Sequence, residues 1–138
     1  MTSDEITEAV VQHAERYGVA KTPEYRKLHA NVCSSPKKER YFGLMGVFKR
    51  DLKTDKLRAQ TLAGRMLQKI TPRPMESCEA SIFRLLENWD VSAEEVIFYL
   101  RQQHGTENVL CAIDTIREGQ LTELDIATLE SMKFWCGK

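Results

Sequence analysis

The stretch Trp89–Leu100 carries the most complete helix-start signal in the chain, and it limits the possible fold more than any other feature. Ser92 and Glu95 have the spacing of a capping box, in which a hydroxyl and a carboxylate each bind a backbone N–H left free in the first turn. Val91 and Val96 have the spacing of a hydrophobic staple, which fixes the angle at which the chain enters the helix. We therefore expect a helix to start at Ser92 and to lie at the centre of the fold.

Similar start signals, followed by apolar residues at helical spacing, recur along the chain. They are Thr2-x-x-Glu5, Thr22-Pro23, Ser35-Pro36 and Leu121-Thr122 with Asp125. No alternating run rich in Val, Ile and Thr competes for a strand. We predict an all-α fold, a compact bundle of six to eight short helices in a single domain that covers residues 1–138. We expect the first two helices to pack over the core and the hairpin 78–104 to lie near its centre.

The stretch 38–70 is the hardest to divide into helices. A single helix would be about 50 Å long, more than a domain of this size needs. We prefer two helices with a break at Lys53-Thr54-Asp55, where Thr54 or Asp55 can cap the second. Gly43 and Gly46 mark either the close approach of another helix or a weaker, less regular helix start.

The formal net charge of zero hides two blocks of opposite charge. Segment 36–73 has eleven Lys and Arg against three Asp and Glu, a balance of +8, and segment 74–132 has three Arg against twelve carboxylates, a balance of −9. Thr71-Pro72-Arg73-Pro74 lies where the sign changes, and its prolines disfavour helix. We interpret this stretch as a rigid connector inside one domain, since each half is small for an independent core.

The two blocks predict two interaction surfaces of opposite charge. The candidate basic surface consists of Lys37, Lys38, Arg40, Lys49, Lys53, Lys56, Arg58, Arg65, Lys69 and Arg73. The candidate acidic surface consists of Glu87, Asp90, Glu94, Glu95, Glu107, Asp114 and Glu118. Because complementary charges speed and orient association, we expect a non-catalytic protein–protein interaction or regulatory domain, an adaptor that binds a protein partner or a second copy of itself.

The alternative is a nucleic-acid-binding regulator that places the basic segment 36–73 on phosphates. On helical spacing, one face holds Lys49, Lys53 and Lys56, another holds Arg58, Arg65 and Lys69, and Tyr41 and Phe42 are close enough to stack on bases. The stretch from Leu85 to Leu100 also has the outline of a helix-turn-helix. Glu94 and Glu95 would meet phosphates there with like charge, so a plain helical hairpin is the better interpretation.

The order of apolar positions from Leu62 to Val109 resembles that of death domains. The resemblance rests on Leu62-Ala63, on Leu85-Leu86 with Trp89, and on Val96, Leu100 and Val109. The segment between Trp89 and the next helix is shorter than in typical members. Death domains assemble through opposed charged surfaces, which the two charge blocks would suit, and the resemblance assigns no role to any residue.

The residues that usually carry chemistry are scattered. Cys33, Cys78, Cys111 and Cys136 lack the tight spacing of a disulfide scaffold or zinc site and are expected to be free thiols, and His13, His29 and His104 fall on three different predicted helices. No Gly-rich phosphate loop or hydrolase motif is present. We therefore expect no enzyme activity, cofactor or metal, although His and Cys side chains from distant positions could still converge on a metal.

Two features bear on localisation. No apolar run approaches the length of a membrane span, and the first residues are acidic, unlike the basic start of a signal peptide. We therefore expect a cytoplasmic protein without a membrane partner.

Overall fold

Eight α-helices and one 3₁₀ turn, without a strand, make up the computed structural model, which describes residues 1–138. The elements are α1 (Ser3–Tyr17), α2 (Pro23–Cys33), α3 (Lys37–Gly46), η1 (Val47–Lys49), α4 (Lys56–Ile70), α5 (Cys78–Leu85), α6 (Glu95–His104), α7 (Thr106–Arg117) and α8 (Glu123–Cys136). The predicted all-α bundle of short helices is confirmed. None of these helices is long and apolar enough to cross a lipid bilayer.

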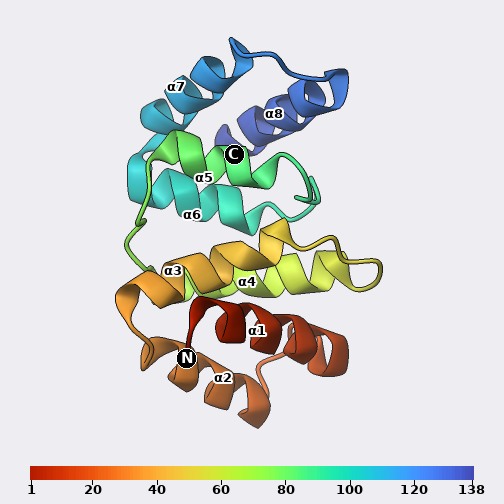
Figure 1. Ribbon diagram of the computed structural model, residues 1–138, viewed down its shortest axis with the longest axis vertical. Helices are drawn as coiled ribbons and strands as arrows, with labels where there is room; N and C mark the ends of the chain where they lie inside the picture. Colours follow the sequence, from red (N-terminus) through yellow and green to blue (C-terminus); the bar gives the residue numbers. More distant parts are fainter.

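The helices form a stack in which α3 and α4 make the middle layer (Figure 1). On one side lie α1 and then α2, and on the other lie α5 and α6, followed by α7 and α8. A continuous cluster of buried apolar side chains extends from Ile6 in α1 to Met132 in α8. The chain therefore folds around one core and forms one domain.

Helix α1 lies inside the stack and not over the core, contrary to expectation. Ile6, Val10 and Ala14 are completely buried, and α1 packs on both α3 and α4. This position is possible because Gly43 has no side chain: a Cβ atom built there would lie 2.6 Å from the Cβ atom of Ile6. Of the two interpretations of Gly43 and Gly46, the close approach of another helix is therefore the correct one. Of the first two helices, only α2 is peripheral.

Three of the predicted helix starts are confirmed in detail. Thr2 and Thr122 each form a complete capping box with the residue three positions later. The Thr22 hydroxyl accepts a hydrogen bond from the Tyr25 N–H, with proline at the first helical position. At Ser35 the prediction is wrong, because the hydroxyl donates to the Asn31 carbonyl of the preceding helix and Pro36 precedes α3 without a side-chain cap.

The predicted capping box at Ser92 is also wrong. Helix α6 begins at Glu95, and no side chain caps it. The Ser92 N–H instead donates to Asp90 Oδ1 at 2.9 Å, which closes a turn before the helix. Val91 is 43% exposed, so it forms no staple with the fully buried Val96. Asp90 therefore takes the N–H that Glu95 would bind in the predicted capping box, and the helix starts later than predicted.

The stretch 38–70 consists of two helices joined by η1 and a loop, which confirms the predicted break. Neither Thr54 nor Asp55 caps α4. Asp55 adopts a left-handed backbone conformation with φ 56°, and its side chain makes no cap hydrogen bond. Arg58 lies 3.7 Å from the Asp55 carboxylate instead, one turn into the helix.

The connector after α4 is held to the rest of the domain. Thr71 ends α4 in a left-handed conformation with φ 50°, and the Tyr99 hydroxyl of α6 donates to the Pro72 carbonyl. The predicted hairpin 78–104 is not a closely packed pair. Helix α5 packs on α7 and η1, whereas α6 packs on α4, α7 and α8.

Candidate interaction surfaces

The predicted basic residues do not form one surface. Lys37, Lys38 and Arg40 lie at the start of α3, Lys49, Lys53, Lys56 and Arg58 lie near the loop before α4, and Arg65, Lys69 and Arg73 lie at the far end of α4 and in the connector. The expected helical face of Lys49, Lys53 and Lys56 does not exist, because a loop separates η1 from α4. Arg58, Arg65 and Lys69 do lie on a single helix, α4.

The predicted acidic residues are spread over α6, α7 and the connections around them, and one of them is not a surface residue. Glu95 has a side chain that is 15% exposed and lies 3.7 Å from Arg65 Nε of α4. Burial raises the pKa of Glu95. Asp114 is exposed and pairs with Lys133 of α8 at 3.7 Å. The remaining members are Glu87, Asp90, Glu94, Glu107 and Glu118, of which Asp90 and Glu94 are partly buried.

The two charge blocks nevertheless occupy different layers. Segment 36–73 forms the middle layer, and segment 74–132 forms most of the α5–α8 end of the stack (Figure 1). Arg65 and Glu95 pair where the two layers meet. Folding therefore keeps the charge asymmetry of the sequence in space and neutralises part of it at the contact.

A hollow of about 640 Å³ lies at the junction of these layers, and we call it the α5–α8 groove. Its walls come from η1, from α5 and its flanks, and from the turn before α8 with the first turn of α8: Lys49, Glu76, Ala80, Phe83, Arg84, Leu86, Glu87, Gln120, Leu121 and Asp125. One predicted basic residue, Lys49, and one predicted acidic residue, Glu87, thus meet across a single groove.

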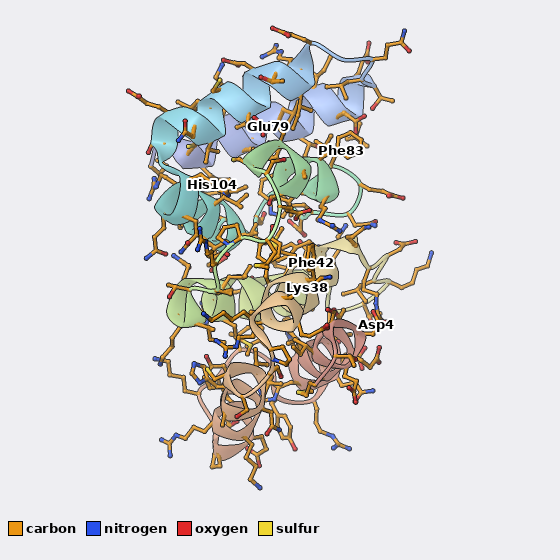
Figure 2. The ribbon with its side chains drawn as sticks, turned by 60° about the vertical axis from the view of Figure 1, so that its left-hand side comes forward. Asp4, Lys38, Phe42, Glu79, Phe83 and His104 are labelled. Carbon is orange, nitrogen blue, oxygen red and sulfur yellow. The ribbon has the colours of Figure 1, made fainter.

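Phe83 is the residue of this groove that sequence reasoning missed. Its side chain is 63% exposed, whereas Cys78, Ile82 and Leu85 of the same helix are buried. Figure 2 shows Phe83 on α5, with Phe42 below it on α3. The sequence does carry a signal for Phe83: at helical spacing this aromatic residue falls outside the apolar stripe of its helix.

The groove is supported by a hydrogen-bonded network. The Tyr41 hydroxyl donates to Glu76 Oε2 at 2.6 Å, and Arg84 Nε lies 2.8 Å from both oxygens of the same carboxylate. The Arg84 guanidinium also lies 5.2 Å from the ring centre of Phe42. Burial raises the pKa of Tyr41, so its hydroxyl stays protonated and remains a donor. These contacts tie α5 and the residue before it to α3.

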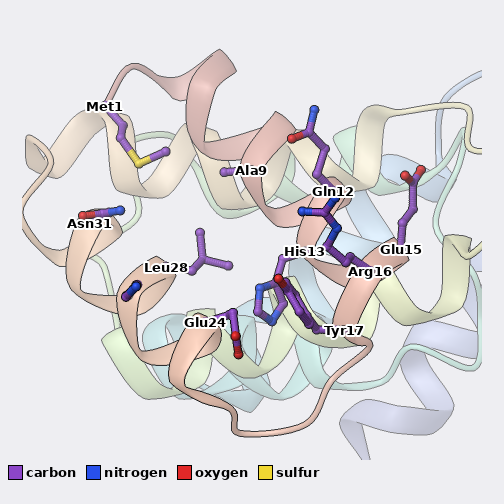
Figure 3. Close-up of a pocket in the computed structure, with 11 residues that line it drawn as sticks. Met1, Ala9, Gln12, His13, Glu15, Arg16, Tyr17, Glu24, Leu28 and Asn31 are labelled. Atoms are coloured by element: carbon purple, nitrogen blue, oxygen red, sulfur yellow. The ribbon is translucent and has the colours of Figure 1, made fainter.

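A second hollow, of about 730 Å³, lies between α1 and α2 (Figure 3). His13 lines it beside Tyr17, with ring centres 5.0 Å apart, and the His13 Nε2 atom is buried without a hydrogen-bond partner. Burial lowers the pKa of His13. The hollow is also lined by Glu15, Arg16, Glu24 and Lys27. Their charges balance, so this hollow favours no particular class of ligand.

The other histidines and the cysteines do not form a metal site. No group of three or more His, Cys, Asp or Glu side chains converges in a way that could hold a metal ion. All four cysteines are free thiols, and burial raises the pKa of Cys78 to about 11. His104 ends α6 as expected from Gly105, but burial lowers its pKa and so opposes the charged form that a helix C-terminus favours.

Comparison with known proteins adds no assignment. No protein-family model matches the chain, and neither a curated protein nor a solved structure is similar to it.

Proposed function

We propose that this chain is a non-catalytic protein-interaction module that docks a short segment of another protein in the α5–α8 groove. The observation that supports this function is the position of Phe83. An aromatic ring that is 63% exposed lies on the wall of a hollow whose other apolar residues are Ala80, Leu86 and Leu121. Exposed aromatic residues beside a pocket are typical of the few positions that dominate binding energy at protein interfaces.

The charges around the groove indicate the chemistry of the partner. Glu76 and Arg84 neutralise each other through their ion pair, so the charges left for a partner are Lys49, Glu87 and Asp125. Segment 74–132, which forms most of the groove, has an excess of nine negative charges. A partner segment with a large apolar residue and neighbouring Lys or Arg residues is therefore the best complement, because opposite charges steer and orient association.

A library of random peptides displayed on phage tests the proposal. We expect the wild-type protein to select peptides with an aromatic or leucine residue flanked by Lys or Arg, and raised salt to weaken their binding. Phe83→Asp should abolish this selection, because a carboxylate would replace the apolar anchor. Phe134→Asp is the matched control, since Phe134 is 55% exposed on α8 and does not line the groove.

Two results would contradict the proposal. One is the recovery of no common peptide pattern by the wild-type protein. The other is equal selection by the wild type and Phe83→Asp. Gel filtration with light scattering tests whether a second copy of this chain fills the groove. A wild-type dimer that becomes a monomer on Phe83→Asp would show that it does.

A further inference from the structure

Two shallow hollows adjoin each other over α4, away from the α5–α8 groove. One, of about 380 Å³, lies between α4, α2 and the loop before α2, and the other, of about 410 Å³, lies between α4 and α6. Gln68 lines both, so the two hollows are neighbours, and we call them together the α4 groove. Its polar residues are Lys21, Arg65, Gln68, Lys69, Arg101 and Gln102.

The α4 groove is positively charged throughout. Its four cations come from three parts of the chain, and none of the residues that line either hollow is a carboxylate. Lys21 and Lys69 form no ion pair. Arg65 has one carboxylate neighbour, Glu95, at 3.7 Å. The groove therefore gathers positive charge that the protein itself neutralises only in part.

Both arginines already contact neighbouring groups, Arg101 through a hydrogen bond and Arg65 through a longer ion pair. Arg101 Nη1 donates to the Cys136 carbonyl at 3.1 Å, and its guanidinium lies 5.0 Å from the ring centre of Phe98. Arg65 is positioned by Glu95 of the neighbouring helix. Cations that are already ordered lose less conformational entropy when they bind an anion. Gln68 and Gln102 add amide donors between the charged groups.

We propose that the α4 groove binds the sugar–phosphate backbone of a single-stranded nucleic acid. Phosphodiesters carry a regularly spaced negative charge, and several cations on one surface bind them together by releasing counterions. A groove with cations along it and no base-reading helix fits a single strand bound without sequence preference. Duplex DNA is a poorer fit, because no helix projects from this surface to enter a major groove.

Fluorescence anisotropy with a labelled oligothymidylate of about 15 nucleotides tests this proposal. We expect binding at low salt that weakens linearly on logarithmic axes as salt rises. The double variant Lys21→Glu/Lys69→Glu should bind at least about tenfold more weakly and lower the magnitude of the salt slope by about 1.4, which corresponds to two lost phosphate contacts on a single strand. Both side chains are exposed, so the variant should fold, which circular dichroism checks.

Lys53→Glu/Arg58→Glu is the matched control. It changes the net charge by the same amount, with Lys53 in the loop before α4 and Arg58 in the first turn of α4, roughly 16 Å along the helix axis from Lys69. We expect this control to keep the wild-type salt slope. Equal weakening by both double variants would overturn the proposal, because it would mean that only the overall charge matters.

Competition experiments separate the possible sources of negative charge. Inorganic phosphate at an equal phosphate concentration should leave the oligonucleotide bound, and displacement by it would overturn the proposal in favour of a small-anion site. Polyglutamate should compete poorly, and equal binding of polyglutamate would assign the groove to an acidic protein segment.

Absence of oligonucleotide binding at low salt would also reject the site. The Phe83→Asp variant should bind the oligonucleotide normally, so failure here is distinguishable from failure of the peptide-docking function.

Discussion

Two contacts between helices depend on a glycine, and the polar groups that lie at these two contacts are very different. Where α1 crosses α3, Gly43 lies against Ile6, and the Thr7 hydroxyl donates to the Gly43 carbonyl at 2.6 Å. Where α4 meets α6, a Cβ atom at Gly64 would lie 2.7 Å from the Cβ atom of Glu95. Every polar group named at the first contact is satisfied, because the Glu39 carboxylate of α3 also accepts from the Ser3 N–H and hydroxyl of α1. The second contact holds a carboxylate that is only 15% exposed and that lacks a partner for one oxygen.

This difference separates a contact that only stabilises from one that also positions charge. Glu95 Oε1 is buried without a hydrogen-bond partner, and burial raises the pKa of the carboxyl group. An imperfectly solvated carboxylate costs free energy. The same carboxylate holds Arg65 on the edge of the α4 groove. The α4–α6 contact thus gives up some stability and fixes a cation where the proposed nucleic-acid site requires one.

The largest expected effect comes from Gly43→Ala, which disrupts the α1–α3 contact. The new methyl group would overlap the Cβ and Cγ2 atoms of Ile6, which cannot move away without shifting α1. Overpacking of this kind outweighs the gain of about 1 kcal/mol in helix propensity, so we expect a net loss of about 2–3 kcal/mol. Urea unfolding measures the loss. Gly137→Ala, where the nearest atom is 3.5 Å away, is the control and should change stability by less than about 0.5 kcal/mol.

Gly64→Ala tests the second contact and should cost about 1–2 kcal/mol in the same assay. The methyl group would meet Glu95 Cβ and, at 3.1 Å, the backbone nitrogen of Val96. The loss should be smaller than at Gly43, because these atoms belong to the first turn of α6, which no side chain caps. A loss larger than that of Gly43→Ala would show that the α4–α6 contact is the less adaptable of the two.

The helix starts show which parts of this fold could be predicted from the sequence. At Thr2, Thr22 and Thr122 the capping hydroxyl and the N–H that it binds are three residues apart, so the decision is local. At Ser92 the local signal is overruled. Asp90 takes the Ser92 N–H, and Glu95 is engaged with α4. The central position of α1 could not be derived either, because it depends on a contact across distant parts of the chain.

The candidate sites show the same limit. Arg65 and Lys69 of the α4 groove belong to the basic segment 36–73, yet Lys21 and Arg101 lie outside that segment. A window along the sequence cannot bring together residues from the loop before α2, from α4 and from α6. Conversely, proximity in sequence grouped Lys49 with Lys53, whereas folding places Lys49 in the α5–α8 groove beside acidic residues.

Thr7→Val tests the polar part of the α1–α3 contact without changing its shape. The substitution removes the hydrogen bond to the Gly43 carbonyl and leaves that buried acceptor without this donor. We expect a loss of about 1 kcal/mol by urea unfolding, the usual net worth of a buried hydrogen bond. Thr7→Ser retains the hydroxyl and is the control for the bond. Equal losses in the two variants would show that the methyl group of Thr7, and not its hydroxyl, stabilises the contact.

Glu95→Gln tests the charged part of the α4–α6 contact and should have the smallest effect, below about 1 kcal/mol. Because burial raises the pKa of Glu95, the folded state keeps this proton to a higher pH than the unfolded chain does. The stability that the protonated group contributes is complete below the unfolded pKa, near 4.5, and is lost as pH rises through the folded pKa. The stability of Glu95→Gln relative to the wild type should therefore increase from about pH 4 toward neutral pH, as urea unfolding at each pH would show. Glu118→Gln, at an exposed position, is the control. A relative stability that falls with rising pH would mean that attraction to Arg65 outweighs burial, and the α4–α6 contact would then be as well satisfied as the α1–α3 contact.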